Sequence, residues 1–245
     1  MKKAIVAVSF GTTYAQAEQT CIRPVEQALA AAYPDWQVRR AYTAGIVMRR
    51  LRERGERIDS VPEALDKLRQ EGFDKVALAS THVIPGVEYE ALCKAAGDLP
   101  VSEALLSSEG DLVWMAKLME GIAAEEGTPV LFMGHGTDHA ADEIYVRLRE
   151  LLPANVYIAC VEGAHRLDTI LPQLETIAEK NVTLAPLMLV AGDHAHNDLA
   201  GDEDDSWKSI LEKRGFGVKV RMRGLGSELA VQQRICEKVG KILQD

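Results

Sequence analysis

Two distant stretches of the chain follow one pattern, an apolar run that ends in glycine and threonine. Lys3–Thr12 reads KAIVAVSFGT and Thr128–Thr137 reads TPVLFMGHGT, so that Phe10 aligns with His135. A run of this kind is typical of a buried strand that stops at a sharp glycine turn. A chain that carries the pattern twice is constrained towards a duplicated architecture.

A second pair of stretches supports the duplication. Val76–Glu88 reads VALASTHVIPGVE and Val182–His194 reads VTLAPLMLVAGDH, which places Glu88 opposite His194. We therefore interpret the two halves of the chain as two versions of one structural unit.

Strand-like and helix-like segments alternate along both halves. The sequence predicts strands over Lys3–Phe10, Gln37–Tyr42, Lys75–Ser80, Val101–Leu106, Pro129–Met133, Val156–Cys160, Val182–Val190 and Val218–Met222. It predicts helices over Ala15–Tyr33, Ala44–Arg54, Asp111–Glu125, His139–Leu151, Leu167–Glu179, Trp207–Lys213 and Glu228–Leu243, with a further helix capped by Ser60 and ended by Gly72. Strands separated by helices form parallel sheets through right-handed crossovers.

The predicted fold is therefore α/β, with two similar Rossmann-like domains whose parallel sheets face a cleft. A chain of 245 residues is long enough to build two such cores. We expect an N-terminal domain over residues 1–126 and a C-terminal domain over residues 127–245. The terminal helix is expected either to stay with the second domain or to pack on the first.

Charge and composition exclude several classes of partner. The net charge of −9 argues against binding to a nucleic-acid backbone, and no apolar run reaches the length of a membrane span. The four cysteines lie far apart and are expected to be reduced thiols, as in a cytoplasmic protein. The first residues resemble a short secretion signal, but we interpret Lys3–Phe10 as the first strand.

Polar side chains follow three strands of the second half. His135 stands between two glycines, Glu162 follows Val156–Cys160, and His194 follows the long strand. The carboxyl ends of parallel strands share one sheet edge, where ligands bind. Each residue alone is explained by a structural role: a turn histidine, a helix-end carboxylate or a strand cap. Together, two imidazoles and a carboxylate suit Co²⁺, Ni²⁺, Fe²⁺ or Zn²⁺.

Other histidines near this edge have less defined roles. His194 and His196 form an H-x-H pair, whose rings would point the same way in an extended chain. His196 is then a fourth ligand or a neighbour that orients the site, or it faces solvent. His165 is a similar secondary candidate, and His139 is expected to be structural. In the first half, His82 and Glu88 are the counterparts that would line an opposite wall.

Seven arginines gather in one segment of the first half. A solvated helix face is the usual explanation of such a run, and carboxylate recognition is the functional one. They are Arg39, Arg40, Arg49, Arg50, Arg52, Arg54 and Arg57. The sequence has neither a G-x-G-x-x-G after a strand nor a Walker loop, so we expect no nucleotide cofactor.

Five motifs identify a resemblance. VSFGTT, HVIPGVEYE, GHGT, VEG and AGDHAHNDLAGDEDDSW resemble the anaerobic sirohydrochlorin cobaltochelatases, class II chelatases of cobalamin synthesis, over nearly the whole chain. The resemblance implies two α/β domains around a tetrapyrrole cleft and insertion of Co²⁺ into sirohydrochlorin without ATP. It also implies that His135, Glu162 and His194 hold the metal and that both histidines are catalytic.

Further expectations follow from the same comparison of motifs. Phe10, Thr12, Glu88 and Gly136 are expected to contact the substrate. Some relatives are exported and bind haem at subunit contacts, whereas this chain is expected to be of the cytoplasmic type, with a homo-oligomer left open. Competing hypotheses are insertion of iron or nickel into a related tetrapyrrole, a metal or haem carrier without turnover, and a phosphate-site histidine motif at GHGT.

Overall fold

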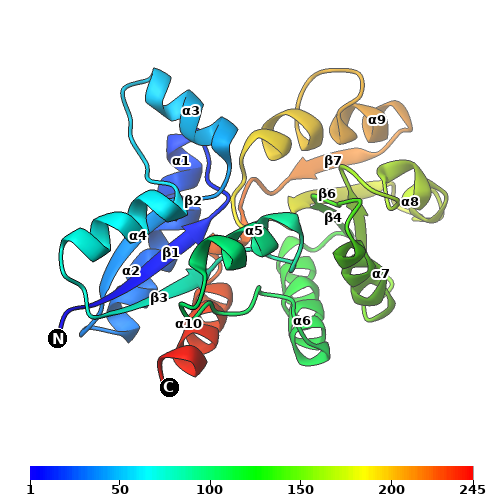
Figure 1. The fold of residues 1–245 in the computed structure, drawn as a ribbon. Coiled ribbons are helices and arrows are strands. Elements are labelled where there is room, and N and C mark those ends of the chain that lie inside the picture. The colour runs from blue at the N-terminus through cyan, green and yellow to red at the C-terminus, as the bar shows by residue number, and fades with distance from the viewer. Residues whose placement is uncertain (245) are drawn as a thin grey trace. The chain divides into compact units, whose positions relative to one another are not determined.

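The computed structural model describes residues Met1–Gln244, and the chain divides into two compact units (Figure 1). Unit 1 comprises Met1–Ser107 together with the chain from Gly226 onward, and unit 2 comprises Ser108–Leu225. Asp245, the last residue of the expected second domain, lies outside the described residues. Unit 2 is therefore inserted into unit 1 along the chain.

Helix α6 (Glu109–Glu126) begins unit 2, whereas the sequence placed a division near residue 126. The helix starts at Ser108, whose side chain accepts a hydrogen bond from the Asp111 amide. At its other end Glu126 forms an ion pair of 3.0 Å with Arg221, and both side chains are more than nine-tenths buried. This buried pair fastens α6 to unit 2.

The sheet of unit 1 has the strand order β2-β1-β3, and both pairings are parallel. Its strands are β1 (Lys3–Ser9), β2 (Gln37–Tyr42) and β3 (Lys75–Ser80). Its helices are α1 (Ala15–Ala17), a π-helical turn (Glu18–Ile22), α2 (Arg23–Ala32), α3 (Gly45–Glu53), α4 (Val61–Gln70), α5 (Val87–Ala96) and α10 (Leu229–Leu243).

Alternation along β1 explains how this sheet is covered. Ala4, Val6 and Val8 point to one face and pack with α4 and α5 in a single core. The terminal helix α10 packs with α2 and β3 in the same unit, and the Tyr33 hydroxyl donates to the carbonyl of Cys236 at 2.7 Å.

The sheet of unit 2 has the order β5-β4-β6-β7, again with parallel pairings. Its strands are β4 (Val130–Gly134), β5 (Val156–Cys160), β6 (Asn181–Pro186) and β7 (Gly217–Val220). After α6 come a 3₁₀ turn (Ala140–Asp142), α7 (Glu143–Glu150), α8 (Leu167–Leu174), a π-helical turn (Ala195–Leu199) and α9 (Trp207–Lys213), and a 3₁₀ turn (Leu225–Ser227) leads back into unit 1. Helices α8 and α9 pack on one face of this sheet.

The two units repeat one topology, which confirms the predicted fold class. In each, the first strand is central, the second strand lies on one side and the third lies on the other. The first pair of aligned stretches contains β1 and β4, and the second pair overlaps β3 and β6. His135 therefore follows the central strand of its sheet, as Phe10 does in unit 1.

One predicted strand is absent, and others are shorter than predicted. Val101–Leu106 is not a strand, because only Val101 forms a bridge, to Leu78, before the chain leaves the sheet. The strand expected over Val182–Val190 ends at Pro186, which forms the last pair with β4, opposite Met133. None of the helices in residues 1–244 combines the length and the apolar character needed to cross a membrane.

Candidate metal centre

The turn after β4 is built on two glycines that other residues cannot replace. A Cβ at Gly134 would lie 2.7 Å from the ring of Tyr145, and one at Gly136 would lie 2.0 Å from the carbonyl oxygen of Glu162. Gly136 also has a φ of +78°, which side chains disfavour. The turn can therefore press against the loop after β5, and His135 is held beside Glu162.

Backbone and side-chain contacts fix this arrangement. The Glu162 amide donates to the His135 carbonyl at 2.8 Å, which joins the two loops directly. Below the turn, burial raises the pKa of Tyr145, and burial raises the pKa of Cys160 to about 12. Both groups stay protonated and serve as packing. Asp142 accepts the Thr137 amide at 3.1 Å and closes the loop.

The structure brings the rings of His135 and His194 together. Their centroids are 4.9 Å apart, and the planes are nearly perpendicular at 84°. Nδ1 of His135 lies 2.8 Å from the carbonyl oxygen of Gly136, which can only accept, so Nδ1 carries the proton. The lone pair of this imidazole is therefore available at Nε2.

His194 is oriented in the same way by a carboxylate. It heads the π-helical turn Ala195–Leu199, and its Nδ1 lies 2.8 Å from Oδ2 of Asp198. A histidine that gives one ring proton to a carboxylate presents its other nitrogen as a more basic ligand. The sequence analysis missed Asp198, although its spacing of four residues from His194 in a helical turn is the signal that could have identified it.

The backbone of Glu162 is bonded to the backbone of His135, and the side chain of Glu162 is exposed. Within residues 1–244, no three His, Cys, Asp or Glu side chains stand close enough together to hold a metal ion. The structure thus assembles the histidine pair and places Glu162 on the adjoining loop. It does not bring the carboxylate onto the pair.

His196 faces solvent, which is one of the roles that the sequence left open. The chain from His194 onward is helical rather than extended, so His194 and His196 do not point the same way. Nδ1 of His196 instead contacts the carbonyl of Gly192 at 2.9 Å. His165 has its Nε2 3.8 Å from Asp142, and the backbone carbonyl of His165 accepts the amide of Cys160.

The side chain of His139 has a structural role, as expected. Its Nδ1 accepts a hydrogen bond from the Ala141 amide and caps the 3₁₀ turn that leads into α7. It is thereby occupied in holding the loop after His135.

The first-half candidates occupy different environments. Burial lowers the pKa of His82 to about 4, and its Nδ1 contacts the Ser80 hydroxyl at 3.1 Å. Glu88 lies in the first turn of α5. Phe10 is 42% exposed, whereas Thr12 is buried and accepts a hydrogen bond from the Tyr14 amide.

Sequence comparisons give one consistent result. A family model described as "Cobalt chelatase (CbiK)" matches residues 3–244. The "Sirohydrochlorin cobaltochelatase" of Salmonella typhimurium is 37% identical over 95% of this chain and 93% of its own length. The "Sirohydrochlorin cobaltochelatase CbiKC" of Nitratidesulfovibrio vulgaris is also 37% identical, over 91% of this chain and 84% of its own.

A solved structure supports the fold. The protein described as "CbiX, the terminal Enzyme for Biosynthesis of Siroheme in Denitrifying Bacteria" aligns with 98% of this chain and 99% of its own, with a TM-score of 0.56. At 19% identity, this likeness concerns the architecture alone.

Proposed function

This chain belongs to the cobalt chelatase (CbiK) family, and on that premise we propose that it inserts Co²⁺ into sirohydrochlorin. The enzyme is a metal chelatase in which cobalt is a substrate. The observation that carries the proposal is the pair of imidazoles 4.9 Å apart, each with Nδ1 already engaged by an oxygen atom. Both Nε2 atoms are then left for one divalent ion.

We assign the metal site to His135, Glu162 and His194. Imidazole nitrogens and a carboxylate oxygen suit Co²⁺, and a site with only three protein ligands keeps positions open for ring nitrogens. The side chain of Glu162 is exposed, so rotation about its own bonds can bring the carboxylate towards the histidines when the ion binds.

Proton transfer is the second task of the histidines. The ring must lose two N–H protons as Co²⁺ replaces them, so the charge of the macrocycle is unchanged by the exchange. When the metal leaves an imidazole and binds the tetrapyrrole, Nε2 of that imidazole becomes free and can accept a departing proton. Asp198 and the Gly136 carbonyl hold the two rings in place during this exchange. The substrate contacts that we assign to Phe10, Thr12, Glu88 and Gly136 belong to the same proposal.

A turnover assay tests this function. With protein at one-twentieth of the sirohydrochlorin concentration, absorbance should change until the ring is consumed, whereas a carrier would stop at one equivalent. We expect His135→Ala to abolish insertion without altering the circular dichroism spectrum. His196→Ala is the matched control, because His196 is bonded to Gly192 and lies outside the assigned metal site. Full activity of the His135 variant would refute the assignment.

The choice of metal is tested in the same assay. The ligand set does not by itself separate Co²⁺ from Ni²⁺ or Fe²⁺, so the proposal requires a higher kcat/KM for Co²⁺ than for either. A higher value for iron would support the alternative, iron insertion.

We also propose a cytoplasmic location, which agrees with four cysteines that all remain free thiols.

A further inference from the structure

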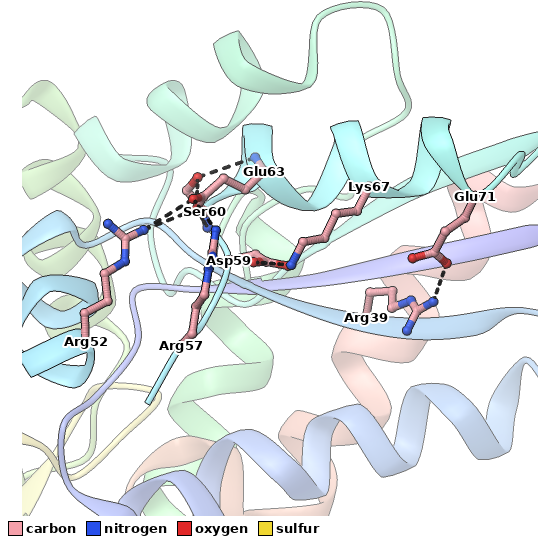
Figure 2. A network of polar contacts seen from close by, with 8 residues as sticks. All are labelled: Arg39, Arg52, Arg57, Asp59, Ser60, Glu63, Lys67 and Glu71. Atoms are coloured by element: carbon pink, nitrogen blue, oxygen red, sulfur yellow. Dashed lines mark hydrogen bonds and ion pairs between the residues drawn. The ribbon is translucent and has the colours of Figure 1, made fainter. Parts of the chain in front are cut away.

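The arginines of unit 1 fall into two classes that the sequence could not separate. Several are already neutralised by carboxylates of the same unit (Figure 2). Arg39 lies 2.6 Å from Glu71, and Arg52 and Arg57 lie 3.4 and 3.6 Å from Glu63. These three side chains have partners and fasten the surface of α4 to its neighbours.

Arg40 belongs to the same class, because its guanidinium lies 2.6 Å from Glu26 in a half-buried position. The three remaining arginines of the segment belong to the second class. Within residues 1–244, Arg49, Arg50 and Arg54 form no ion pair with a carboxylate. Three positive charges are therefore left available to a partner from solution.

Helix α3, which carries these arginines, is fixed at the carboxyl edge of the sheet. At its start, the Ala44 amide donates to the Phe10 carbonyl at 3.2 Å. At its end, Nη1 of Arg54 donates to the Thr13 carbonyl at 2.9 Å. Both ends of α3 are thus tied to the loop after β1, at the sheet edge that corresponds in topology to the edge carrying His135 in unit 2.

The outer face of α3 is both apolar and basic. Met48 and Leu51 are buried, so the opposite side of the helix carries Ile46, Arg49 and Arg50. Ile46 is 51% exposed. Residues 49–54 contain four arginines and one glutamate, so this surface remains positive in a chain whose net charge is −9.

We infer that Arg49, Arg50 and Arg54 bind the carboxylate arms of the tetrapyrrole, with Ile46 and Phe10 offering apolar contact to the ring. We call these five residues the arginine surface. The inference rests on the proposed function, because sirohydrochlorin carries acetate and propionate arms on an apolar macrocycle. Guanidinium groups recognise carboxylates through paired hydrogen bonds, and a negatively charged protein needs such a patch to attract an anionic substrate.

Binding of the metal-free ring tests this surface directly. Titration of sirohydrochlorin against the protein, followed by absorbance without any metal, should give a Kd about tenfold higher for Arg50→Ala and for Arg54→Ala. Arg52→Ala is the matched control, because it removes the same charge from the same helix but from a side chain paired with Glu63. Its Kd should change by less than about twofold.

Kinetics should show the same division. For Arg50→Ala, KM for the ring should rise while kcat and KM for Co²⁺ stay unchanged, because the lost contact is equal in the ground and transition states. The difference between Arg50→Ala and the unsubstituted protein should also shrink as salt is added. Equal ring affinity in Arg50→Ala, Arg54→Ala and the unsubstituted protein would overturn the inference.

Failure of the inference can be told apart from failure of the proposed function. If the unsubstituted protein binds the ring through these arginines but never inserts cobalt, the proposed function fails and the arginine surface stands. If the protein inserts cobalt and the arginine variants bind normally, only the inference fails. If the unsubstituted protein does not bind the ring, both are overturned.

Discussion

Nδ1 of His194 lies 2.8 Å from Oδ2 of Asp198, one helical turn further along the chain. The contact sets the orientation of the ring and leaves Nε2 as the nitrogen that can bind a metal, while the centroid of the His135 ring lies 4.9 Å away. Because His194 precedes the π-helical turn Ala195–Leu199 and Asp198 lies within it, the carboxylate and the imidazole are placed by one local structure.

Asp198→Ala should weaken cobalt binding by about tenfold, because the imidazole loses the acceptor that orients it and raises its basicity. Titration with Co²⁺, followed in the visible spectrum, measures the affinity. Asp202→Ala is the control, since that carboxylate is 95% exposed and pairs with Lys208. Asp198→Asn should retain part of the affinity by keeping an acceptor oxygen. An Asp198→Ala protein with normal cobalt affinity would show that His194 does not need this partner.

Glu162→Ala should also lower cobalt affinity, by about tenfold, if its carboxylate completes the site as proposed. The exposed side chain makes a folding defect unexpected, so thermal unfolding should be unchanged. Glu150→Ala, at another exposed glutamate of unit 2, is the control. Calorimetric titration with Co²⁺ in the absence of the ring measures the change, and an unaltered affinity would leave a two-histidine site.

Gly136→Ala should destabilise the protein by about 3 kcal/mol or more, because a Cβ would strike the Glu162 carbonyl as well as strain the backbone. Gly55 separates the two causes. Its φ of +80° is similar, but nothing lies within 4 Å of an added Cβ, so Gly55→Ala should cost only about 1 kcal/mol. Urea denaturation of both variants measures the difference. Equal losses would mean that the loop after β5 yields to the added methyl group.

The capping box of α4 should make stability depend on pH. Hydrogen bonds from the Ser60 backbone and hydroxyl hold the pKa of Glu63 below its ordinary value of 4.5. A carboxylate with a lowered pKa in the folded state stabilises it above pH 4.5, and this contribution is lost as the pH falls through the lower value.

Comparison of the unsubstituted protein with Glu63→Gln isolates this contribution. The Gln variant should be less stable at pH 7, and the gap should close as the pH falls below about 4.5. Chemical denaturation at several pH values measures the gap. A difference that stays constant over this range would attribute the effect to side-chain packing.

Regular alternation was enough to predict most of the fold. β2, β3, β5 and α9 begin and end where the sequence patterns place them. Val101–Leu106 also contains buried apolar residues, yet it forms only one bridge. Composition reports that a segment is buried, whereas ladder formation depends on where the neighbouring strand ends.

The candidate site shows the same limit. Because His135 and His194 each follow a parallel strand, the sequence predicted that they share one sheet edge. The distance of 4.9 Å between their ring centroids agrees with that prediction. The extended geometry considered for His194 and His196 does not occur, because the chain is helical there, and His196 faces solvent as one of the alternatives expected. The pairing of Arg52 with Glu63, and hence which arginines stay available, depends on distances between separate helices that no periodicity reports.

The insertion of unit 2 within unit 1 bears on how the molecule is made. Helix α10 is synthesised after the whole of unit 2, and it belongs with strands that are synthesised before unit 2. The histidine-bearing unit is continuous, so it can fold while the chain is still being synthesised. The unit with the arginines must wait for its final helix, so a message cut short before Leu229 would leave unit 1 incomplete even where unit 2 had folded.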